Sequence, residues 1–454
     1  LNNVTIKYSI NTVAQPDYNW SGALLPDSAT LIVLGGFKNN VFDPKSFIAT
    51  TWNPNGVTDS NFANDSCFGI SNKILLNGVY EIGTNSVFPT ISSAFKILKE
   101  NGICGSVLFK IENGSYDEKL KLDPVNGASE INTVTFTSKS RNYNDVTINN
   151  QTDTTLRLLG PDNVKFNNLT FRTGSSKGLM RVENGCDNIK FDSVHFINGT
   201  IYSESNIFNK NNIFSNCIFE SHFHYSRSPK LDTTRYSLKI NNCIFFNSLF
   251  EVSMLDTVTI ANNRFFVEKD KFYPGSDVIA IYVTAIGGKT TISKNYVEGF
   301  YKHGIVTSDY HSTKPGTVTI ENNSICGTTA MLKALNCNGS ATANIFYNSI
   351  YSSHTDTSTA NSALIISSIK NVNLKNNIIY NKNGLIADIQ SSLLTGSDYN
   401  VFFSDKKFFR YEGVSKTFAD FKTVTNSDLH SIFLNPKYTS DSDLHYKNDT
   451  LNGF

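Results

Sequence analysis

Residue types that could perform chemistry gather in the stretch 220–237, "ESHFHYSRSPKLDTTRYS". His222 and His224 alternate along the chain, so in an extended segment they share one face and, together with Asp232, could coordinate a metal. The cationic residues of the same stretch could hold an acidic sugar; these are Arg227, Lys230 and Arg235. No further metal ligand is assigned, and a solvated loop explains the same residues.

A second group lies in the stretch 301–316, "YKHGIVTSDYHSTKPG". There, His303 with Asp309 or His311 could form an acid–base pair. If the long interruptions of the chain meet on one side, their aromatic residues could stack on sugar rings; these tyrosines are Tyr225, Tyr236, Tyr273 and Tyr310. The competing explanation is again an ordinary solvated surface.

Catalysis would need more than these groups. A polysaccharide lyase needs Ca²⁺ or Arg to neutralise a uronate carboxylate and a base such as Lys or Arg to take the α-proton, whereas a hydrolase needs paired carboxylates. The expected strands carry no acidic cluster at the repeat spacing, and their outward positions are mostly Thr, Lys, Asn and Ser. We therefore identify no catalytic residue and predict neither a metal site nor a cofactor, with Ca²⁺ expected only if the protein is a lyase.

The elements that must position these residues are repeats. One phrase of strand, Asn-Asn and strand recurs with varied residues, as in "VKFNNLTF" at 164, "LKINNCIF" at 238 and "VNLKNNIIY" at 372. The repeats align on their third apolar residue: Phe166, Phe191, Phe214, Ile240, Ile260, Ile292, Ile320, Ile345 and Leu374. The steps run from 20 to 32 residues, with strands and no helices between them, so they predict a solenoid and not a propeller. The expected fold is all-β, a right-handed parallel β-helix.

A second column of the alignment explains the asparagines. It is apolar in the early coils, at Leu169, Val194, Cys217 and Cys243. From there on it is polar, at Asn263, Asn295, Asn323, Asn348 and Asn377. An inward asparagine at a bend can hydrogen-bond both the backbone and the amide of the next coil, so we predict a structural asparagine ladder. The two cysteines are expected to stack in the core.

Two further elements precede the repeats. Alternating residues and turns over residues 1–66 predict a small, partial β-sandwich. In "FPTISSAFKILKENG", Thr90 can cap a helix whose apolar residues fall at i, i+3, i+4 and i+7, and Gly102 can take the left-handed position after its end.

Composition limits the partners. The chain has 454 residues, 17% charged residues and a net charge of +1, so no global field favours nucleic acid or an anionic membrane. No apolar run is long enough to span a membrane, and the odd number of cysteines, seven, favours neither a disulfide framework nor a zinc site.

From about Leu75 onward the chain resembles the secreted right-handed β-helix proteins of the pectin-lyase-like superfamily, in the form found in Bacteroidetes. The resemblance lies in "GVYEIGTNSVFPTISSAFKILKENGICGSVLFKIENGSYDEKLKL" and in the closing phrases "DLHSIFLNPKYTS" and "DLHYKN", where His430 and His445 are expected to be hydrogen-bonded cap residues. Residues 1–66, with "YNWSGALLPDSATLIVLG", resemble the immunoglobulin-like modules that precede larger domains in such surface proteins. The expected domains are therefore an immunoglobulin-like sandwich over 1–66, a linker and first strand over 67–86, and a β-helix with an N-terminal capping helix over 87–454.

The resemblance implies a secreted or cell-surface protein, exported by the type IX secretion machinery. We predict an adhesin or glycan-binding module whose partner is an extended glycan or another cell surface. Two alternatives stay open. One is a polysaccharide lyase or glycoside hydrolase, and the other is a non-catalytic spacer of a larger surface protein.

Overall fold

The computed structural model describes residues 1–35, 45–70, 75–205, 209–227, 236–253, 255–268, 279–284, 288–299, 303–309, 316–327, 332–337, 342–353, 361–390, 394–405 and 409–447. At residues 70, 204, 205, 227, 309, 327 and 332–337 it describes the backbone alone. The chain divides into two compact units. One comprises Leu1–Leu76 with Glu100–Ile103, and the other Asn77–Lys99 with Cys104–Phe454.

The described part of the first unit holds one antiparallel sheet in which β1 pairs with β2, β3 and β4, and β4 pairs with β5. The strands are β1 (Asn3–Ile10), β2 (Val13–Ala14), β3 (Tyr18–Ser21), β4 (Ser46–Trp52) and β5 (Ser66–Ile70). Val4 and Ile6 are buried on one face, whereas Ile48 and Phe68 pair across the strands and stay exposed on the other. A second sheet, which a sandwich requires, is not among the described residues of this unit, so the immunoglobulin-like module stays a prediction.

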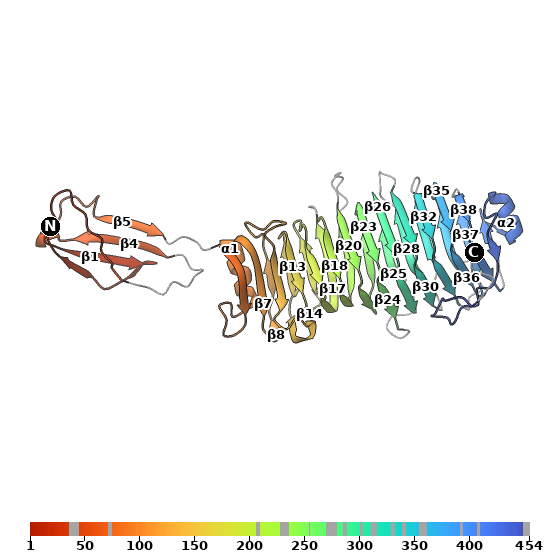
Figure 1. Cartoon of the computed structure of the whole chain (residues 1–454), viewed down its shortest axis with the longest axis horizontal. Helices are drawn as coiled ribbons and strands as arrows, with labels where there is room; N and C mark the ends of the chain where they lie inside the picture. Colours follow the sequence, from red (N-terminus) through yellow and green to blue (C-terminus); the bar gives the residue numbers. More distant parts are fainter. Residues whose placement is uncertain are drawn as a thin grey trace. The chain divides into compact units, whose positions relative to one another are not determined.

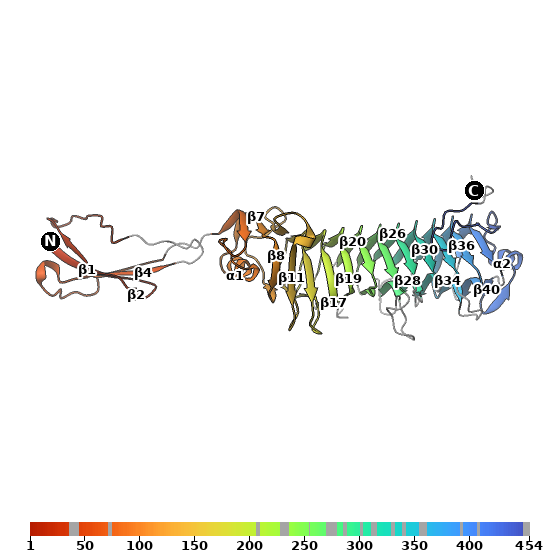
Figure 2. The same ribbon diagram turned by 90° about the horizontal axis from the view of Figure 1, so that it is seen from below.

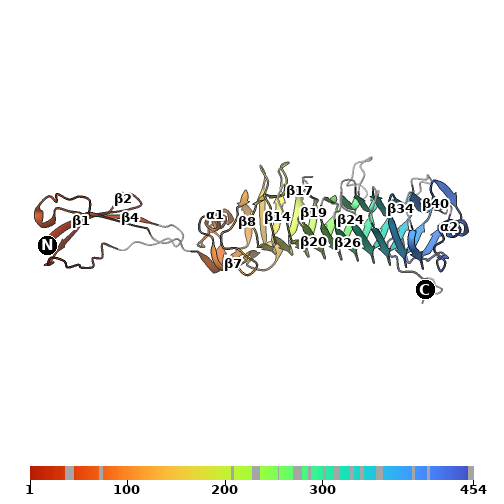
Figure 3. The ribbon, with the colours of Figure 1, turned by 90° about the horizontal axis from the view of Figure 1, so that it is seen from above.

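The second unit is the right-handed parallel β-helix that the repeats predicted (Figure 1). Each coil contributes one strand to each of three faces, here called sheets I, II and III. Figures 2 and 3 show the stacked strands from two opposite sides.

Sheet I is a sheet of thirteen strands in the described part of the chain, paired in parallel from β7 onward. Its strands are β6 (Leu76–Ile82), β7 (Ile103–Ile111), β10 (Val134–Ser138), β13 (Val164–Asn167), β16 (Lys190–Asp192), β18 (Asn212–Ser215), β20 (Ser237–Asn241), β23 (Thr257–Ala261), β26 (Lys289–Ser293), β29 (Thr317–Glu321), β32 (Thr342–Phe346), β35 (Asn371–Lys375) and β38 (Leu394–Asp398).

Sheets II and III are joined because β17 (His195–Ser205) and β19 (Ile218–Arg227) run through both. Sheet II also holds β8 (Gly114–Asp117), β11 (Val146–Asn150), β14 (Thr170–Thr173), β21 (Ile244–Phe246), β24 (Arg264–Val267), β27 (Tyr296–Gly299), β30 (Ser324–Gly327), β33 (Ser349–Ser352), β36 (Ile378–Asn381), β39 (Val401–Ser404) and β42 (Ile432–Phe433). Sheet III also holds β9 (Leu120–Leu122), β12 (Leu156–Leu159), β15 (Met180–Glu183), β22 (Phe250–Ser253), β25 (Ile279–Thr284), β28 (His303–Asp309), β31 (Leu332–Cys337), β34 (Ser362–Ser367), β37 (Leu385–Gln390), β40 (Phe409–Tyr411) and β41 (Val414–Lys416).

The core is built from columns of identical positions in successive coils. The nine aligned apolar residues of the sequence analysis pair in register, from Phe166 opposite Phe191 to Ile345 opposite Leu374. In the early coils this column is a stack of phenylalanine rings; the centroids of Phe191 and Phe214 lie 4.9 Å apart. The predicted alignment is confirmed.

The capping helix is α1 (Ile91–Asn101), which lies at the start of the solenoid in Figure 1. As predicted, the Thr90 hydroxyl accepts the backbone N–H of Ser93 at 3.1 Å, and Gly102 has a left-handed φ of 77°. The ring of Phe95 packs edge-on against Phe136 of β10 at 5.0 Å, so the helix covers the open end of the hydrophobic core.

The other end is closed by a second helix, α2 (Phe418–Thr425), which the sequence analysis did not predict. Phe421 of this helix stacks on Phe409 at 4.4 Å. The hydroxyl of Thr417 accepts the N–H of Asp420, a capping pattern that could have revealed the helix. No helix among the described residues is long and apolar enough to cross a membrane.

The final described segment folds back along the outside of sheet II. Tyr296 donates a hydrogen bond to the carbonyl of Ser442 at 2.6 Å, and Tyr351 donates to the Asp441 carboxylate at 3.0 Å. The segment therefore bonds to more than one coil of sheet II, and it lies beside β30 and β36 (Figure 2).

Candidate functional site

A groove of about 500 Å³ lies on the outward face of sheet I. It follows the coil axis, because its lining residues come from five successive strands, β13 to β23, and from the turns that precede β10, β13, β16 and β18. They are Glu130, Thr133, Asn163, Lys165, Asn188, Lys190, Asn211, Asn212, Ile213, Ser237, Leu238, Lys239, Thr257 and Thr259.

A row of three lysines and one isoleucine forms the floor of this groove. Each points outward because its neighbours on both sides are buried, as Val164 and Phe166 are around Lys165. Register places Lys165 opposite Lys190 and places Ile213 between Lys190 and Lys239 on consecutive coils. Strand spacing then sets neighbours in the row about 4.8 Å apart along the axis.

The edge of the groove is a chain of polar side chains. The Nδ2 atom of Asn188 donates to Oδ1 of Asn163 at 3.0 Å, and Asn211 donates to Asn188 at 3.2 Å. The Ser237 hydroxyl lies 3.1 Å from Oδ1 of Asn211 and donates to it. These bonds fix the orientation of the amides, so the edge presents a rigid series of polar groups to anything that lies along the floor.

The charge of the groove is positive. Lys190 and Lys239 are exposed, and Lys165 is half-buried. Glu130 is the one carboxylate in the described lining. Two nearby aspartates have structural roles. Asp162 accepts the backbone N–H of Asp187 at 2.7 Å, and Asp187 accepts that of Lys210 at 2.7 Å. Burial raises the pKa of the Asp187 carboxyl, and the Asp162 charge adds to the shift.

The groove lysines were not predicted from the sequence. Their signal stands in the repeat phrases themselves, since "VKF" and "LKI" place a lysine between two inward residues. A lysine at a single outward position is unremarkable, and only the column shows that three of them share one row.

The predicted residues His222 and His224 lie elsewhere, on β19 in sheet III, and residues 220–227 are strand instead of the expected loop. The backbone N–H of Leu249 donates to Nδ1 of His222 at 3.2 Å, and burial lowers the pKa of this histidine. His224 pairs with Glu251 at 3.1 Å and stacks on Tyr202 at 5.1 Å. Both histidines are thus engaged by neighbouring coils.

The side chains of Tyr225 and Tyr236 are buried, which contradicts the prediction that they stack on an external sugar. Tyr225 is 1% exposed and its hydroxyl accepts a hydrogen bond from Asn212 at 2.8 Å; Tyr236 is 3% exposed. Tyr225 points inward because it alternates with His224 along a continuous strand, a pattern that the loop assignment obscured.

His303 begins β28 and is buried. The side chains of its proposed partners, Asp309 and His311, lie outside the described residues. The same holds for the side chains of six other predicted site residues: Arg227, Lys230, Asp232, Arg235, Tyr273 and Tyr310. Within the described ranges, no three His, Cys, Asp or Glu side chains are grouped so as to hold a metal ion. Calcium dependence stays a prediction tied to the lyase alternative.

The asparagine ladder lies at the bend between sheets I and II, inside the coils. Asn263 donates through Nδ2 to Oδ1 of Asn295 at 3.0 Å, and the same bond links Asn295 to Asn323, Asn323 to Asn348 and Asn348 to Asn377. The residue before each ladder position takes the left-handed conformation, with φ of 57° at Asn262. The two asparagines of the phrase therefore have different roles. The first takes the left-handed backbone conformation at the bend, and the second forms the hydrogen bonds between coils.

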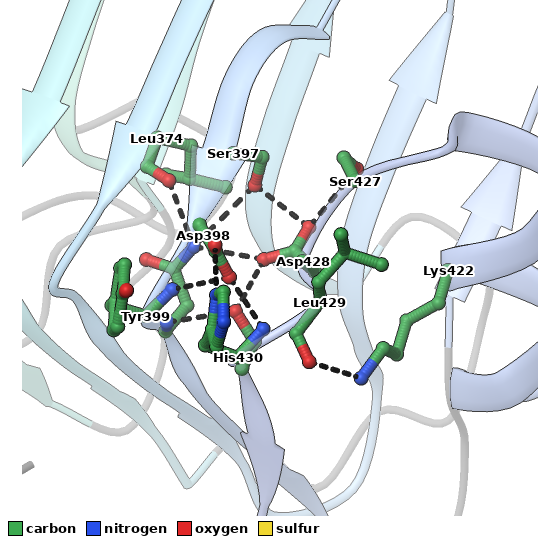
Figure 4. Close-up of polar contacts among 11 residues, drawn as sticks. Leu374, Ser397, Asp398, Tyr399, Lys422, Ser427, Asp428, Leu429 and His430 are labelled. Atoms are coloured by element: carbon green, nitrogen blue, oxygen red, sulfur yellow. Dashed lines mark hydrogen bonds and ion pairs between the residues drawn. The ribbon is translucent and has the colours of Figure 1, made fainter.

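The ladder continues one coil beyond the prediction and ends on the carboxylate of Asp428, which Figure 4 shows with Ser397 and Ser427. Asn377 donates to Asn400 at 3.1 Å, and Asn400 donates to Oδ1 of the fully buried Asp428 at 3.0 Å. Asp428 also accepts hydrogen bonds from Ser397 and Ser431.

The cap histidines are hydrogen-bonded as predicted. His430 donates its backbone N–H to Asp398 and lies 2.7 Å from the same carboxylate through Nδ1 (Figure 4). His445 contacts Asp443. Burial acts to raise the pKa of Asp398, but the hydrogen bonds from His430 and Tyr399 outweigh it and hold the pKa below its usual value.

In the early coils the same column holds free, buried cysteines. Cys217 and Cys243 are unpaired, and burial raises the pKa of the Cys217 thiol well above its usual value. They stack in the core, as predicted.

Comparisons with known proteins give fold likenesses only. No protein-family model and no curated protein matches the chain. Among solved structures, a pectin methylesterase from Aspergillus niger is 13% identical, with 82% of this chain and 95% of that chain covered and a TM-score of 0.27. A family 28 exopolygalacturonase from Yersinia enterocolitica is 8% identical, with 91% and 94% covered and a TM-score of 0.31.

A PL6 family alginate lyase is 11% identical with a TM-score of 0.43; 81% of this chain is covered, but only 57% of the lyase. At these identities and TM-scores, no residue role is transferred from any of the three proteins.

Proposed function

We propose that the protein binds an extended anionic glycan along the groove of sheet I. The observation that carries the proposal is the row of Lys165, Lys190 and Lys239 on the groove floor. The row from Lys165 to Thr259 crosses five coils, and four steps of about 4.8 Å give a floor of roughly 19 Å, long enough for several sugars of an extended chain.

The groove chemistry favours a glycan over other polyanions. Amides and hydroxyls along the edge suit sugar hydroxyl groups, while the lysines suit carboxylate or sulfate groups. A nucleic acid would favour a wider basic surface, and the net charge of the chain is only +1.

Binding without turnover is the proposed activity. A hydrolase needs two carboxylates about 5 to 9.5 Å apart, and Glu130 alone supplies a carboxylate to the described lining. The proposal includes a location outside the cell, as a secreted or surface-attached protein; export by the type IX machinery stays a prediction from the resemblance.

One observation favours a second candidate, a polysaccharide lyase. Lys165 and Lys190 stand on neighbouring coils, so one could neutralise a uronate carboxylate while the other takes the α-proton. Release of unsaturated uronates from an acidic polymer would establish this alternative.

The test is retention on immobilised glycans, acidic and neutral, over a range of salt concentrations, with product absorbance followed in parallel. The double variant Lys190→Gln, Lys239→Gln should bind an acidic glycan roughly 2- to 30-fold more weakly, because each exposed ion pair contributes about 0.2–1 kcal/mol. Lys375→Gln is the matched control, since Lys375 is an exposed lysine on the same sheet outside the groove lining. If both variants behave alike, or if no glycan is retained at any salt concentration, the proposal is wrong.

A further inference from the structure

The lysine row of the groove is interrupted at one position. Along consecutive coils it reads Lys165, Lys190, Ile213, Lys239 and Thr259, in one outward register. Ile213 lines the groove and is partly exposed. An apolar side chain therefore separates two cations that lie two coil steps, about 9.6 Å, apart.

A pyranose in an extended chain is about as long as one coil step, so successive sugars fall over successive residues of the row. A homopolymer of uronic acids would place one carboxylate over Ile213, where no cation in the row faces it. Removing that carboxylate from water without a partner is unfavourable.

A polymer in which acidic and neutral sugars alternate avoids this conflict. Its acidic sugars face Lys190 and Lys239, and the neutral sugar between them lies on Ile213. An N-acetylated sugar suits that position best, because its methyl group can pack on the isoleucine while its amide faces the polar edge at Asn211 and Ser237.

From this pattern we infer that the stretch of the groove formed by Lys190, Ile213 and Lys239 selects glycans whose acidic groups occur on every second sugar, with an N-acetylated sugar between them. The inference rests on the proposed function and names its substrate class. Ile213 is the specificity-determining residue.

The experiment compares hyaluronan, an alternating polymer of glucuronate and N-acetylglucosamine, with polygalacturonate, at equal ionic strength and equal chain length. The wild-type protein should bind hyaluronan more tightly. Ile213→Lys fills the gap in the row and should shift the affinity ratio toward polygalacturonate by roughly 2- to 5-fold. Thr291→Lys is the matched control, since it adds the same charge in the same column outside the groove and should leave the ratio unchanged.

Circular dichroism establishes that each variant is folded. Ile213→Thr gives an independent reading, because it removes the apolar contact without adding charge and should weaken hyaluronan binding alone. Equal or tighter wild-type binding to polygalacturonate overturns the inference and leaves the proposed function standing, and so does an affinity ratio that Ile213→Lys does not shift. Retention of neither polymer, nor of any other glycan, refutes the proposed function itself.

Discussion

Replacing Asn323 by alanine should reveal how strongly the asparagine ladder stabilises the coils. Its Nδ2 atom donates to the carbonyl of Ile292 and to Oδ1 of Asn348, both at 2.9 Å. Its Oδ1 atom accepts the backbone N–H and the Nδ2 of Asn295, both at 3.0 Å. The side chain is 2% exposed, so water cannot take over these bonds without opening the coil.

The magnitude follows from the groups that lose their partner. Alanine removes the acceptor of the Asn295 N–H and the side-chain donor to the Ile292 carbonyl. A buried polar group without a partner costs about 1–3 kcal/mol, so the two together predict a loss of about 2–6 kcal/mol in local stability. That loss corresponds to amide exchange faster by roughly 30- to 20,000-fold at Asn295, if exchange occurs through local opening.

The assay is native-state hydrogen exchange, followed for peptides that cover residues 288–299. A local readout is needed because a solenoid opens in segments and a single unfolding free energy does not describe it. The control is Cys217→Ala, at the same column in the apolar half of the solenoid, which should cost only about 1 kcal/mol of lost burial. Exchange at Asn295 that is no faster in Asn323→Ala than in the control would refute the stabilising role of the ladder.

Three further predictions concern the last coils and the free cysteines. Asp428→Ala should destabilise the last coils by roughly 3–5 kcal/mol, measured by native-state hydrogen exchange of peptides from those coils. Asp428→Asn keeps an acceptor and should cost clearly less; equal losses would contradict this account. His430 holds the pKa of Asp398 low, so the pair should stabilise the fold above the usual carboxyl pKa of 3.8 and lose this effect as pH falls through the lowered value. Asp398→Asn should therefore lower Tm at pH 7 but not in strong acid. A Tm difference between the variant and the wild type that does not depend on pH would count against this prediction. A thiol reagent should modify the exposed Cys67 in the native protein and the buried Cys217 only after unfolding, as mapped by mass spectrometry; rapid native labelling of Cys217 would show that the column is open.

The β-helix could be predicted from sequence because each coil repeats the same inward positions. A column such as Phe166, Phe191 and Phe214 has one member per coil, so a shift of one residue would turn every core side chain outward. The ladder could be predicted for the same reason, since an inward polar residue must find a partner and the next coil is the nearest source.

The groove could not be predicted in the same way. Outward residues such as Lys190 are compatible with ordinary solvated surface, and a groove depends on how they align with Glu130 and Thr133 from a neighbouring turn. Helix α2 was missed because eight residues with few apolar positions give little periodic signal. Tyr225 was assigned to a loop because residues 220–237 were treated as one interruption between repeats, whereas β19 extends to Arg227.

The one-way direction of the asparagine ladder also bears on how such a chain can change length. Every bond between ladder asparagines, from Asn263 to Asn400, runs from the Nδ2 of one coil to the Oδ1 of the next coil toward the C-terminal end. Any ladder coil can therefore follow any other, and the duplication or loss of a whole coil leaves the hydrogen bonding complete. Asp428 accepts a hydrogen bond from Asn400 but has no side-chain donor for a following coil. Coils can therefore be gained or lost within the ladder, but the ladder cannot be extended beyond Asp428.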